Sequence, residues 1–273
     1  MTETPPPLPV SASGLSAIEV ARQCARAARG IIRDAYGRSA VTTVKGRGNI
    51  ATEADSAVEA EVTRILRREF PSHAVLSEET AASTRSDGWM WVCDPIDGTT
   101  NFSRGIPHFA FSIALCHDSK PVVALTDHPL LEDEFAAVAG QGATLNGAPM
   151  RMGEAKTIRE AVVAFDLGYD DGRGTRQLQT ALHLWPGMQA LRITGSAALG
   201  FAYAAAGRWD LYVHLKLEAW DIAAGILLVR EAGGIVTARD GNDATLFSET
   251  AIAGTAGTHA DFLGLAGGLP WQA

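Results

Sequence analysis

Three short, apolar, β-rich runs stand close together in the first half of the chain and constrain its fold more than any other feature. They are separated by turn residues and comprise WMWVC (89–93), FAFSIALC (109–116) and PVVAL (121–125). Two of them are almost continuously apolar, which is typical of strands covered on both faces. The pattern therefore predicts a helix-covered sheet in a layered α/β or α+β protein.

Two amphipathic patterns upstream predict helices. The first begins where Ser16 and Glu19 have the spacing of a capping box, and it ends at Tyr36-Gly37. Its apolar positions recur at helical spacing: Leu15, Ile18, Ala21, Ala25, Ala28 and Ile32. After a segment expected to be a loop (45–52), the second helix opens at Asp55 and ends before Pro71. Its apolar face consists of Val58, Val62, Ile65, Leu66 and Phe70.

The second half of the chain alternates expected strands and helices after a turn region (139–150). The expected elements are a strand (161–165), a helix (196–206), a strand (210–215), a helix (222–232) and a strand (235–238). The segment 169–175 is expected to be a mobile loop. We therefore expect one domain over residues 15–265, in two halves (about 15–150 and 151–265), with a flexible leader (1–14) and a tail (266–273).

Charge and composition disfavour several function classes. The 273 residues are 47% hydrophobic and 20% charged, which fits a folded globular protein. Acidic residues outnumber basic ones, 31 against 23, and the net charge of −8 disfavours binding to nucleic acid or to an anionic membrane. The first ten residues do not have the pattern of a signal peptide. Three scattered cysteines, Cys24, Cys93 and Cys116, indicate buried thiols in a reducing cytoplasm.

The densest group of reactive side chains lies in WVCDPIDGTTNF (91–102), where an apolar strand ends in two carboxylates. Asp94 and Asp97 repel each other unless a cation lies between them, and hard oxygen ligands favour Mg²⁺ or a similar ion. The backbone amides of Gly98-Thr99-Thr100, at a possible helix start, are suited to an anion such as phosphate. A carboxylate–metal–phosphate arrangement suggests phosphoryl transfer. The alternative is that the two aspartates only form turns and caps.

Three further acidic positions stand at the ends of expected elements. Glu78-Glu79 follows a probable strand (74–76), Asp55 opens a helix, and Asp221 precedes the apolar run IAAGILLV. Each has a structural alternative, since Asp is a common helix cap and paired glutamates are common in solvated loops. A carboxylate that leads into a buried helix also lies in the interior, where a metal ion can compensate its charge.

Together these positions resemble a known family. Asp55, SEET (77–80), DPIDGTTNF (94–102), GSAALG (195–200) and WDIAAG (220–225) are similar, in order and approximate spacing, to the motifs of the inositol monophosphatase family of Mg²⁺-dependent, lithium-sensitive phosphatases. The resemblance covers about residues 15 to 265. It implies a layered αβαβα sandwich of the inositol monophosphatase and fructose-1,6-bisphosphatase type, and a homodimer.

The resemblance also implies roles for individual residues. Glu78, Asp94 and the backbone carbonyl of Ile96 would bind one Mg²⁺, and Asp94 would bridge to a second ion completed by Asp97 and Asp221. A third, weaker ion would use Glu78 and water, and Mn²⁺ is a possible substitute. The Thr99 hydroxyl, with Asp55 behind it, would orient or deprotonate the attacking water. The amides of Gly98 and Thr99 would hold the phosphate.

The substrate is less constrained by the motifs. Gly195, Ser196 and Ala197 match the family's substrate-side loop, but the position of the glutamate that contacts the sugar alcohol is occupied by His214, and Glu218 also departs from the family pattern. The resemblance implies a phosphomonoesterase acting on a small phosphorylated alcohol, foremost inositol-1-phosphate. The alternatives are a histidinol-phosphate phosphatase with the same chemistry, a 3′-phosphoadenosine-type nucleotidase and a non-catalytic homologue. The last is disfavoured because every expected metal-ligand position holds the expected side chain.

Overall fold

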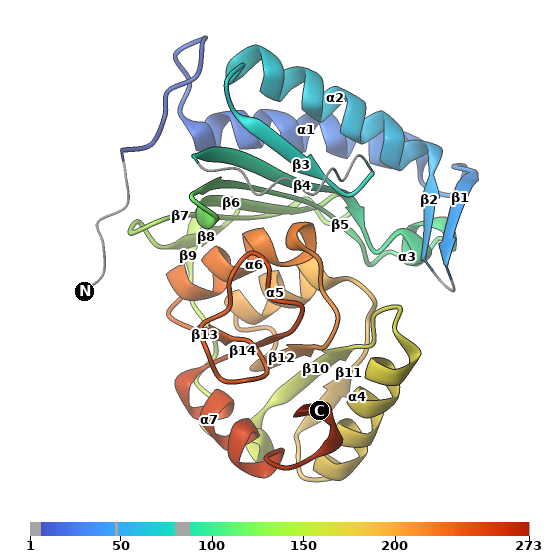
Figure 1. Cartoon of the computed structure of the whole chain (residues 1–273), viewed down its shortest axis with the longest axis vertical. Coiled ribbons are helices and arrows are strands. Elements are labelled where there is room, and N and C mark those ends of the chain that lie inside the picture. Colours follow the sequence, from blue (N-terminus) through green and yellow to red (C-terminus); the bar gives the residue numbers. More distant parts are fainter. Residues whose placement is uncertain (1–6, 47–48, 80–87, 273) are drawn as a thin grey trace.

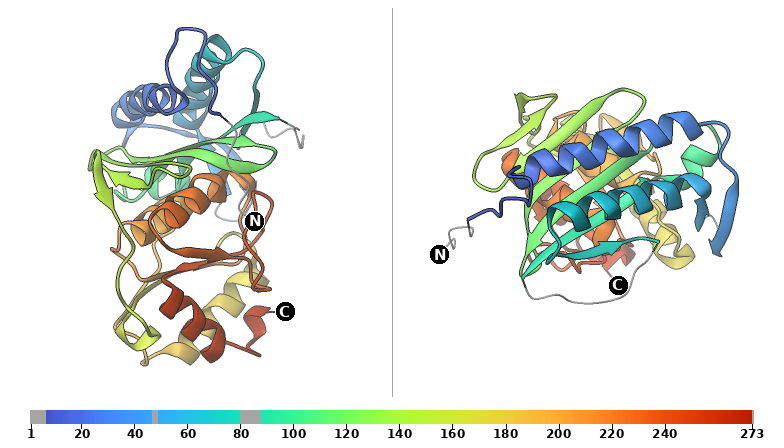
Figure 2. Two further views of the ribbon diagram at one scale, coloured as in Figure 1. Left: turned by 90° about the vertical axis from the view of Figure 1, so that its left-hand side faces the viewer. Right: turned by 90° about the horizontal axis from the view of Figure 1, so that it is seen from above.

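The computed structural model describes residues 7–46, 49–79 and 88–272, and these residues form five stacked layers. In Figure 1, helices α1 and α2 cover the first sheet, α5 and α6 lie between the two sheets, and α4 and α7 cover the outer face of the second sheet. The same layers appear edge-on in Figure 2. The expected αβαβα sandwich is therefore confirmed.

The helices differ in length and in how much of their surface they bury. They are α1 (Ala17–Ala35), α2 (Glu53–Glu69), α3 (Thr99–Ser103), α4 (Asp171–Leu184), α5 (Ala197–Ala205), α6 (Ala219–Glu231) and α7 (Ala256–Leu265), with the 3₁₀ turns η1 (Ile158–Glu160) and η2 (Pro270–Gln272). Helices α5 and α6 are apolar on nearly all sides because both of their faces pack against a sheet.

The strands form two sheets and one hairpin. The hairpin pairs β1 (Val41–Gly46) with β2 (Asn49–Thr52). The first sheet, in spatial order, contains β3 (Ala74–Ser77), β4 (Trp89–Asp97), β5 (Ala110–His117), β6 (Lys120–His128), β7 (Asp133–Val138), β8 (Ala143–Leu145) and β9 (Ala148–Met150). The second contains β11 (Ala190–Arg192), β10 (Val162–Asp166), β12 (Leu211–His214), β14 (Ala251–Gly254) and β13 (Ile235–Thr237).

The start of each covering helix is stabilised by a reciprocal cap. Ser16 and Glu19 form the expected capping box at α1. At α2 the N-cap is Thr52, and Asp55 occupies the third helical position, so the helix begins two residues before the expected start. The loop expected at 45–52 was wrong, because β1 and β2 form an antiparallel hairpin there. Residues 47–48 lie outside the described part of that segment.

The apolar runs of the first half form the centre of the first sheet, as expected. Strands β4 and β5 are antiparallel neighbours, and almost every residue in them is buried. The segment expected to be a turn region (139–150) instead contains the short strands β8 and β9. The three cysteines are buried and unpaired. No described helix is long and apolar enough to cross a membrane.

Two glycines allow the central helices to pack closely. A Cβ at Gly200 in α5 would overlap the ring of Tyr212 on β12, and one at Gly225 in α6 would overlap the ring of Phe201. The α5–α6 layer is thus fixed at short range against the second sheet. This packing places the N-termini of both helices near the end of β4.

The two ends of the chain also contact the folded body. In the described part of the expected leader, the Ala12 N–H donates to the Glu69 carbonyl at 2.8 Å. In the expected tail, Trp271 is fully buried and its ring nitrogen donates to the Ala266 carbonyl at 2.6 Å. The division into leader, two halves and tail remains a prediction.

Candidate active site

Strand β4 ends in the first two acids of the site. Its pairing with β5 becomes irregular between Asp94 and Asp97, which lets both carboxylates turn away from the regular ladder. Gly98 follows with φ +89°, and a Cβ there would lie 3.1 Å from the Gly195 carbonyl oxygen. Only glycine suits this sharp turn into α3. In Figure 1 the turn lies beside the β1–β2 hairpin.

The carboxylates of Asp94, Asp97 and Asp221 converge, with one oxygen of each within 4.8 Å of the others. Burial, followed by the charges of Glu78, Asp97 and Asp221, raises the pKa of Asp94 well above its usual range. The pKa of Asp221 is raised in the same way, by burial and then by Asp97. Asp94 Oδ1 is buried without a hydrogen-bond partner. The three acids therefore lie close together, and Asp94 contributes a buried carboxylate oxygen that has no hydrogen-bond donor.

Asp97 is held by the N-terminus of α5. Its Oδ1 accepts from the Ala197 N–H at 3.1 Å, and its Oδ2 accepts from the Ala198 N–H at 3.0 Å and from the Ser196 hydroxyl. Burial raises the pKa of Asp97 to about 6, and these donors act in the opposite direction. Ser196 and Ala197 were expected on the substrate side, and in the structure their polar groups contact Asp97.

Glu78 follows β3 and is bound to a lysine of the hairpin. Lys45 Nζ lies 3.0 Å from Glu78 Oε1 and 2.7 Å from Glu79 Oε1. Burial raises the pKa of Glu78 to about 7, while Lys45 lowers it. The sequence-based expectation that 45–52 is a loop gave no reason to place Lys45 beside the acids.

Asp55 and Thr99 lie together behind the end of β4. The Thr99 hydroxyl is 3.3 Å from Asp55 Oδ1 and 2.9 Å from the Ile96 carbonyl oxygen. The other oxygen of Asp55 accepts from the Thr52 N–H at 2.7 Å and the Thr52 hydroxyl at 2.6 Å. The capping box of α2 thus fixes Asp55 with one oxygen directed at Thr99.

Asp221 occupies the same helical position as Asp55. The structural alternative for Asp221 was a helix N-cap, but the N-cap of α6 is Glu218, and Asp221 is the third helical residue of its capping box. Its Oδ2 accepts from the Glu218 N–H at 2.7 Å. Two of the candidate acids are therefore fixed by the same backbone device, one on each side of the site.

His214 ends β12 and is 5% exposed. Its Nδ1 accepts from the Lys216 N–H at 3.1 Å, and burial lowers its pKa to about 3. Its strand neighbour in register is Asp166, at the end of β10. Gly195 donates its N–H to Asp166 Oδ1 at 2.6 Å.

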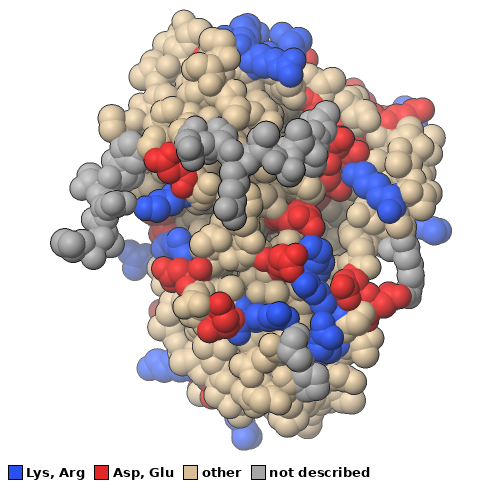
Figure 3. Space-filling view, in the orientation of Figure 1, with Lys and Arg blue, Asp and Glu red and all other residues tan. Residues whose placement is uncertain are grey.

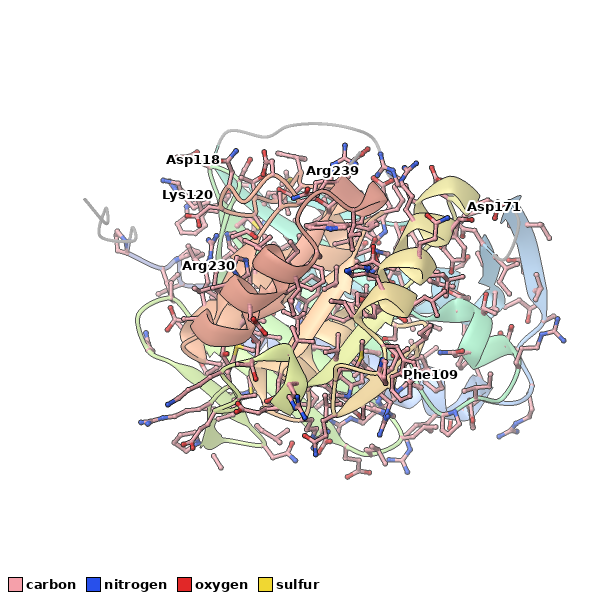
Figure 4. The ribbon with its side chains drawn as sticks, turned by 90° about the horizontal axis from the view of Figure 1, so that it is seen from below. Phe109, Asp118, Lys120, Asp171, Arg230 and Arg239 are labelled. Atoms are coloured by element: carbon pink, nitrogen blue, oxygen red, sulfur yellow. The ribbon has the colours of Figure 1, made fainter. Side chains whose placement is uncertain are left out.

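Sequence analysis missed two residues here. Asp166 carries no motif, and Tyr169 lies in the segment expected to be a mobile loop, although α4 in fact begins at Asp171. The N-terminal end of α4 is the end that faces the β1–β2 hairpin (Figure 1), and Asp171 is labelled there in Figure 4. Tyr169 is 53% exposed, but partial burial of its phenol, and then the charge of Asp97, raise its pKa to about 12, and the phenol hydrogen-bonds with Thr100. Tyr169 therefore stands beside α3 within the influence of the site's acids.

The described residues on one face of the molecule carry charges of both signs. On the face shown in Figure 3, acidic and basic side chains are interspersed over the lower half of the molecule. Among the described residues, Lys216 Nζ lies 2.9 Å from Glu218 Oε1 and 3.2 Å from Glu249 Oε1.

Comparisons with known proteins find relatives over most of the chain. The sequence profile of the inositol monophosphatase family matches residues 15–266. Over 240 residues the chain is 36% identical to Nus factor SuhB of Haemophilus influenzae, covering 86% of this chain and 90% of that protein. It is 35% identical over 234 residues to inositol monophosphatase 2 of Solanum lycopersicum, and the match covers 83% of this chain and 88% of that protein. The crystal structure of extragenic suppressor protein suhB from Bartonella henselae superposes with a TM-score of 0.85 at 32% identity. The match covers 92% of this chain and 99% of that chain.

Proposed function

The chain belongs to the inositol monophosphatase family, and on that premise we propose that it is a Mg²⁺-dependent phosphomonoesterase that hydrolyses inositol-1-phosphate or a related small polyol phosphate. The observation that carries the proposal is the convergence of Asp94, Asp97 and Asp221 within 4.8 Å. A tomato relative of similar length bears the name inositol monophosphatase 2, which supports the substrate class.

The donor set fits a hard divalent cation. All the candidate ligand atoms are oxygens, and Asp94 Oδ1 has no hydrogen-bond partner although it is buried. Among the described residues, no basic side chain lies within ion-pair distance of Asp94, Asp97 or Asp221, whereas Glu78 is paired with Lys45. Glu78, Asp94, Asp97, Asp221 and the Ile96 carbonyl would hold two or three Mg²⁺ ions, or Mn²⁺ in their place. When bound, such ions lower the pKa of a coordinated water and offset negative charge on phosphate and leaving oxygens.

The chain's own groups would orient the reactants. Asp55, fixed by Thr52, accepts the Thr99 proton, so the Thr99 oxygen can in turn accept from the attacking water and aim its lone pair at phosphorus. The Gly98 and Thr99 amides would donate to the phosphate oxygens. Because the water attacks directly, no covalent phosphoenzyme forms.

The leaving alcohol would meet the turn 194–197, His214 and Tyr169. His214 Nδ1 already accepts from the Lys216 N–H, so a neutral His214 has one ring nitrogen, Nε2, left for a polyol hydroxyl. The same replacement of a carboxylate by a histidine favours a second candidate, histidinol phosphate, which needs no paired acceptor for neighbouring hydroxyls. The chemistry at phosphorus is the same for both.

A phosphate-release screen with Mg²⁺ tests the proposal. The substrates are inositol-1-phosphate, histidinol phosphate, fructose-1,6-bisphosphate, glycerol-2-phosphate and 3′-phosphoadenosine 5′-phosphate. We expect the highest kcat/KM for inositol-1-phosphate and no release when Mg²⁺ is chelated. Preference for histidinol phosphate would transfer the proposal to the second candidate. Failure to hydrolyse any ester with Mg²⁺ or Mn²⁺, by protein with native circular dichroism, would contradict the enzymatic proposal.

The remaining expectations belong to the same proposal. We infer a cytoplasmic homodimer that acts on small molecules and has no nucleic-acid or membrane partner; light scattering tests the dimer. The name Nus factor SuhB, carried by a relative at 36% identity, keeps a non-catalytic function as the contrasting class. The Mg²⁺-dependence of the screen separates that class from the enzymes.

A further inference from the structure

We propose that Asp166 is a positioning residue for the active site, whose carboxylate fixes the turn 194–196 and thereby the donors that orient Asp97. The inference rests on the proposed function in so far as Asp97 is taken as a metal ligand. Asp166 ends β10 and is 3% exposed. Nothing in the sequence motifs or in the roles assigned above includes its side chain.

Both oxygens of Asp166 are engaged by different parts of the second half. Oδ1 accepts from the Thr194 N–H at 2.9 Å and from the Gly195 N–H at 2.6 Å. Oδ2 accepts from the hydroxyl of Tyr212 at 3.1 Å. A buried carboxylate with three donors is held in one orientation, and two consecutive backbone N–H groups converge on one of its atoms.

The turn held by Asp166 leads directly into the donors of Asp97. Gly195 has φ +78°, and the next three residues supply the Ser196 hydroxyl and the Ala197 and Ala198 N–H groups to Asp97. These donors engage both Asp97 oxygens, so the carboxylate cannot rotate without losing a bond. The orientation of Asp97 relative to Asp94 and Asp221 therefore follows the position of the turn.

The opposite side of the turn is fixed from the first half. Asn101 Nδ2 donates to the Thr194 carbonyl at 2.7 Å and lies 3.3 Å from the Gly195 carbonyl. Asn101 thus binds the carbonyls of the turn, and Asp166 binds its N–H groups. Removal of the Asp166 carboxylate would leave the N–H groups of Thr194 and Gly195 without this acceptor, which favours displacement of the turn.

The test measures amide exchange and metal binding in full-length protein. In protein without added metal, Asp166→Ala should increase hydrogen exchange about tenfold at Thr194 and Gly195, and also at Ala197 and Ala198, which do not touch Asp166. Calorimetric titration with Mg²⁺ should show affinity weakened about tenfold or more. Asp166→Asn, which keeps an acceptor for the turn, should recover most of both losses.

Asp210→Ala is the matched control. Asp210 Oδ2 accepts the Val162 N–H at 2.9 Å, so this variant also removes a carboxylate–backbone bond, but at the opposite end of β10 and β12. It should leave exchange at residues 194–198 and Mg²⁺ affinity unchanged. Tyr212→Phe, which removes only the donor to Oδ2, substitutes for Asp166→Ala if that variant does not fold; it should increase the same exchange rates to a smaller extent.

Two results would overturn the inference. One is unchanged exchange at Ala197 and Ala198 in Asp166→Ala, and the other is increased exchange with wild-type Mg²⁺ affinity. Neither readout requires turnover. Absence of Mg²⁺-dependent phosphate release by the wild-type protein would therefore contradict the proposed function and leave the exchange result to decide the role of Asp166 in placing the Asp97 donors.

Discussion

The hydroxyl of Ser196 donates a hydrogen bond to the carboxylate of Asp97, although the two residues are 99 positions apart in the chain. Asp97 ends β4 of the first sheet, and Ser196 caps α5 in the layer between the sheets. Because the Ala197 and Ala198 N–H groups join this contact, the helix N-terminus offsets part of the negative charge of Asp97. The candidate metal site thus combines the end of β4 in the first sheet with the start of α5 in the layer between the sheets.

Asp94→Asn should abolish Mg²⁺-dependent turnover while the protein stays folded. An amide cannot supply the same charge to two cations, and loss of such a ligand lowers the rate on the order of 10³-fold or more, which corresponds to several kcal/mol of transition-state stabilisation. The relevant measurement is kcat with inositol-1-phosphate over a range of Mg²⁺ concentrations.

Thermal unfolding of the same variant gives a second readout. Without divalent cations Asp94→Asn should melt at a higher temperature than wild type, because one buried carboxylate is removed from the group formed with Asp97 and Asp221. Asp34→Asn, an exposed change on α1, is the control and should behave as wild type in both assays. Near-normal activity of Asp94→Asn would contradict the metal assignment.

Thr99→Ala should lose most of kcat and retain Mg²⁺ binding. The Thr99 hydroxyl is 3.3 Å from Asp55 Oδ1 and is the group that we propose to orient the attacking water, whereas the carboxylates that would bind metal remain in place. Calorimetric titration with Mg²⁺ beside steady-state kinetics separates the two effects. Thr99→Ser, which keeps the hydroxyl, should recover activity, and simultaneous loss of metal binding and activity in Thr99→Ala would refute the assigned role.

The fold could be predicted where apolar patterning was strong. The buried runs of β4 and β5 and the apolar helices α5 and α6 leave little choice but a layered structure. The β1–β2 hairpin was missed because every residue of β1 is exposed, so the strand carries no apolar alternation. Only the start of α4, within the segment 169–175, was mistaken for a loop, because its first turn, Asp171 to Gly174, contains two glycines, which disfavour helix.

The candidate site could be predicted where acids stand in motifs, but their contacts could not. Helix capping was the structural alternative for Asp55 and Asp221, and both in fact occupy the third helical position of a capping box, which favours acidic residues as an N-cap does. Asp166 and Tyr169 have no motif at all. Asp166 joins the site because parallel strands β10 and β12 end side by side, which places it opposite His214. Such pairing is a property of the register, and a single sequence does not specify it.

His214→Glu should change the preference among alcohol phosphates and leave Mg²⁺ affinity nearly unchanged. A carboxylate can accept from two neighbouring hydroxyls of a polyol, and one altered polar contact changes discrimination by ~1–3 kcal/mol. The measurement is kcat/KM for inositol-1-phosphate and histidinol phosphate under saturating Mg²⁺.

The new carboxylate would also lie next to Asp166 in the sheet, so a neutral variant is needed beside it. His214→Gln keeps a polar side chain without adding charge and serves as that control. If the ratio of the two kcat/KM values is the same in wild type and in His214→Glu, His214 has only a structural role.

The last prediction concerns how stability depends on pH in protein without divalent cations. Burial lowers the pKa of His214 from the usual 6.5 to about 3, so the ring stays neutral in the folded protein while the unfolded chain takes up a proton. Between those two pH values the unfolded state binds more protons, and the contribution of His214 to stability is complete above pH 6.5 and is lost as the pH falls.

The buried acids act in the opposite sense, since burial raises the pKa of Asp97 to about 6 and stabilises its protonated form. The net slope therefore mixes both, and the informative quantity is a difference between variants. The free energy of unfolding, measured in urea, should be higher for wild type than for His214→Gln at pH 7. This difference should be smaller at pH 5, by on the order of 1–2 kcal/mol. A gap independent of pH for His214→Gln would mean that His214 is protonated equally in the folded and unfolded protein.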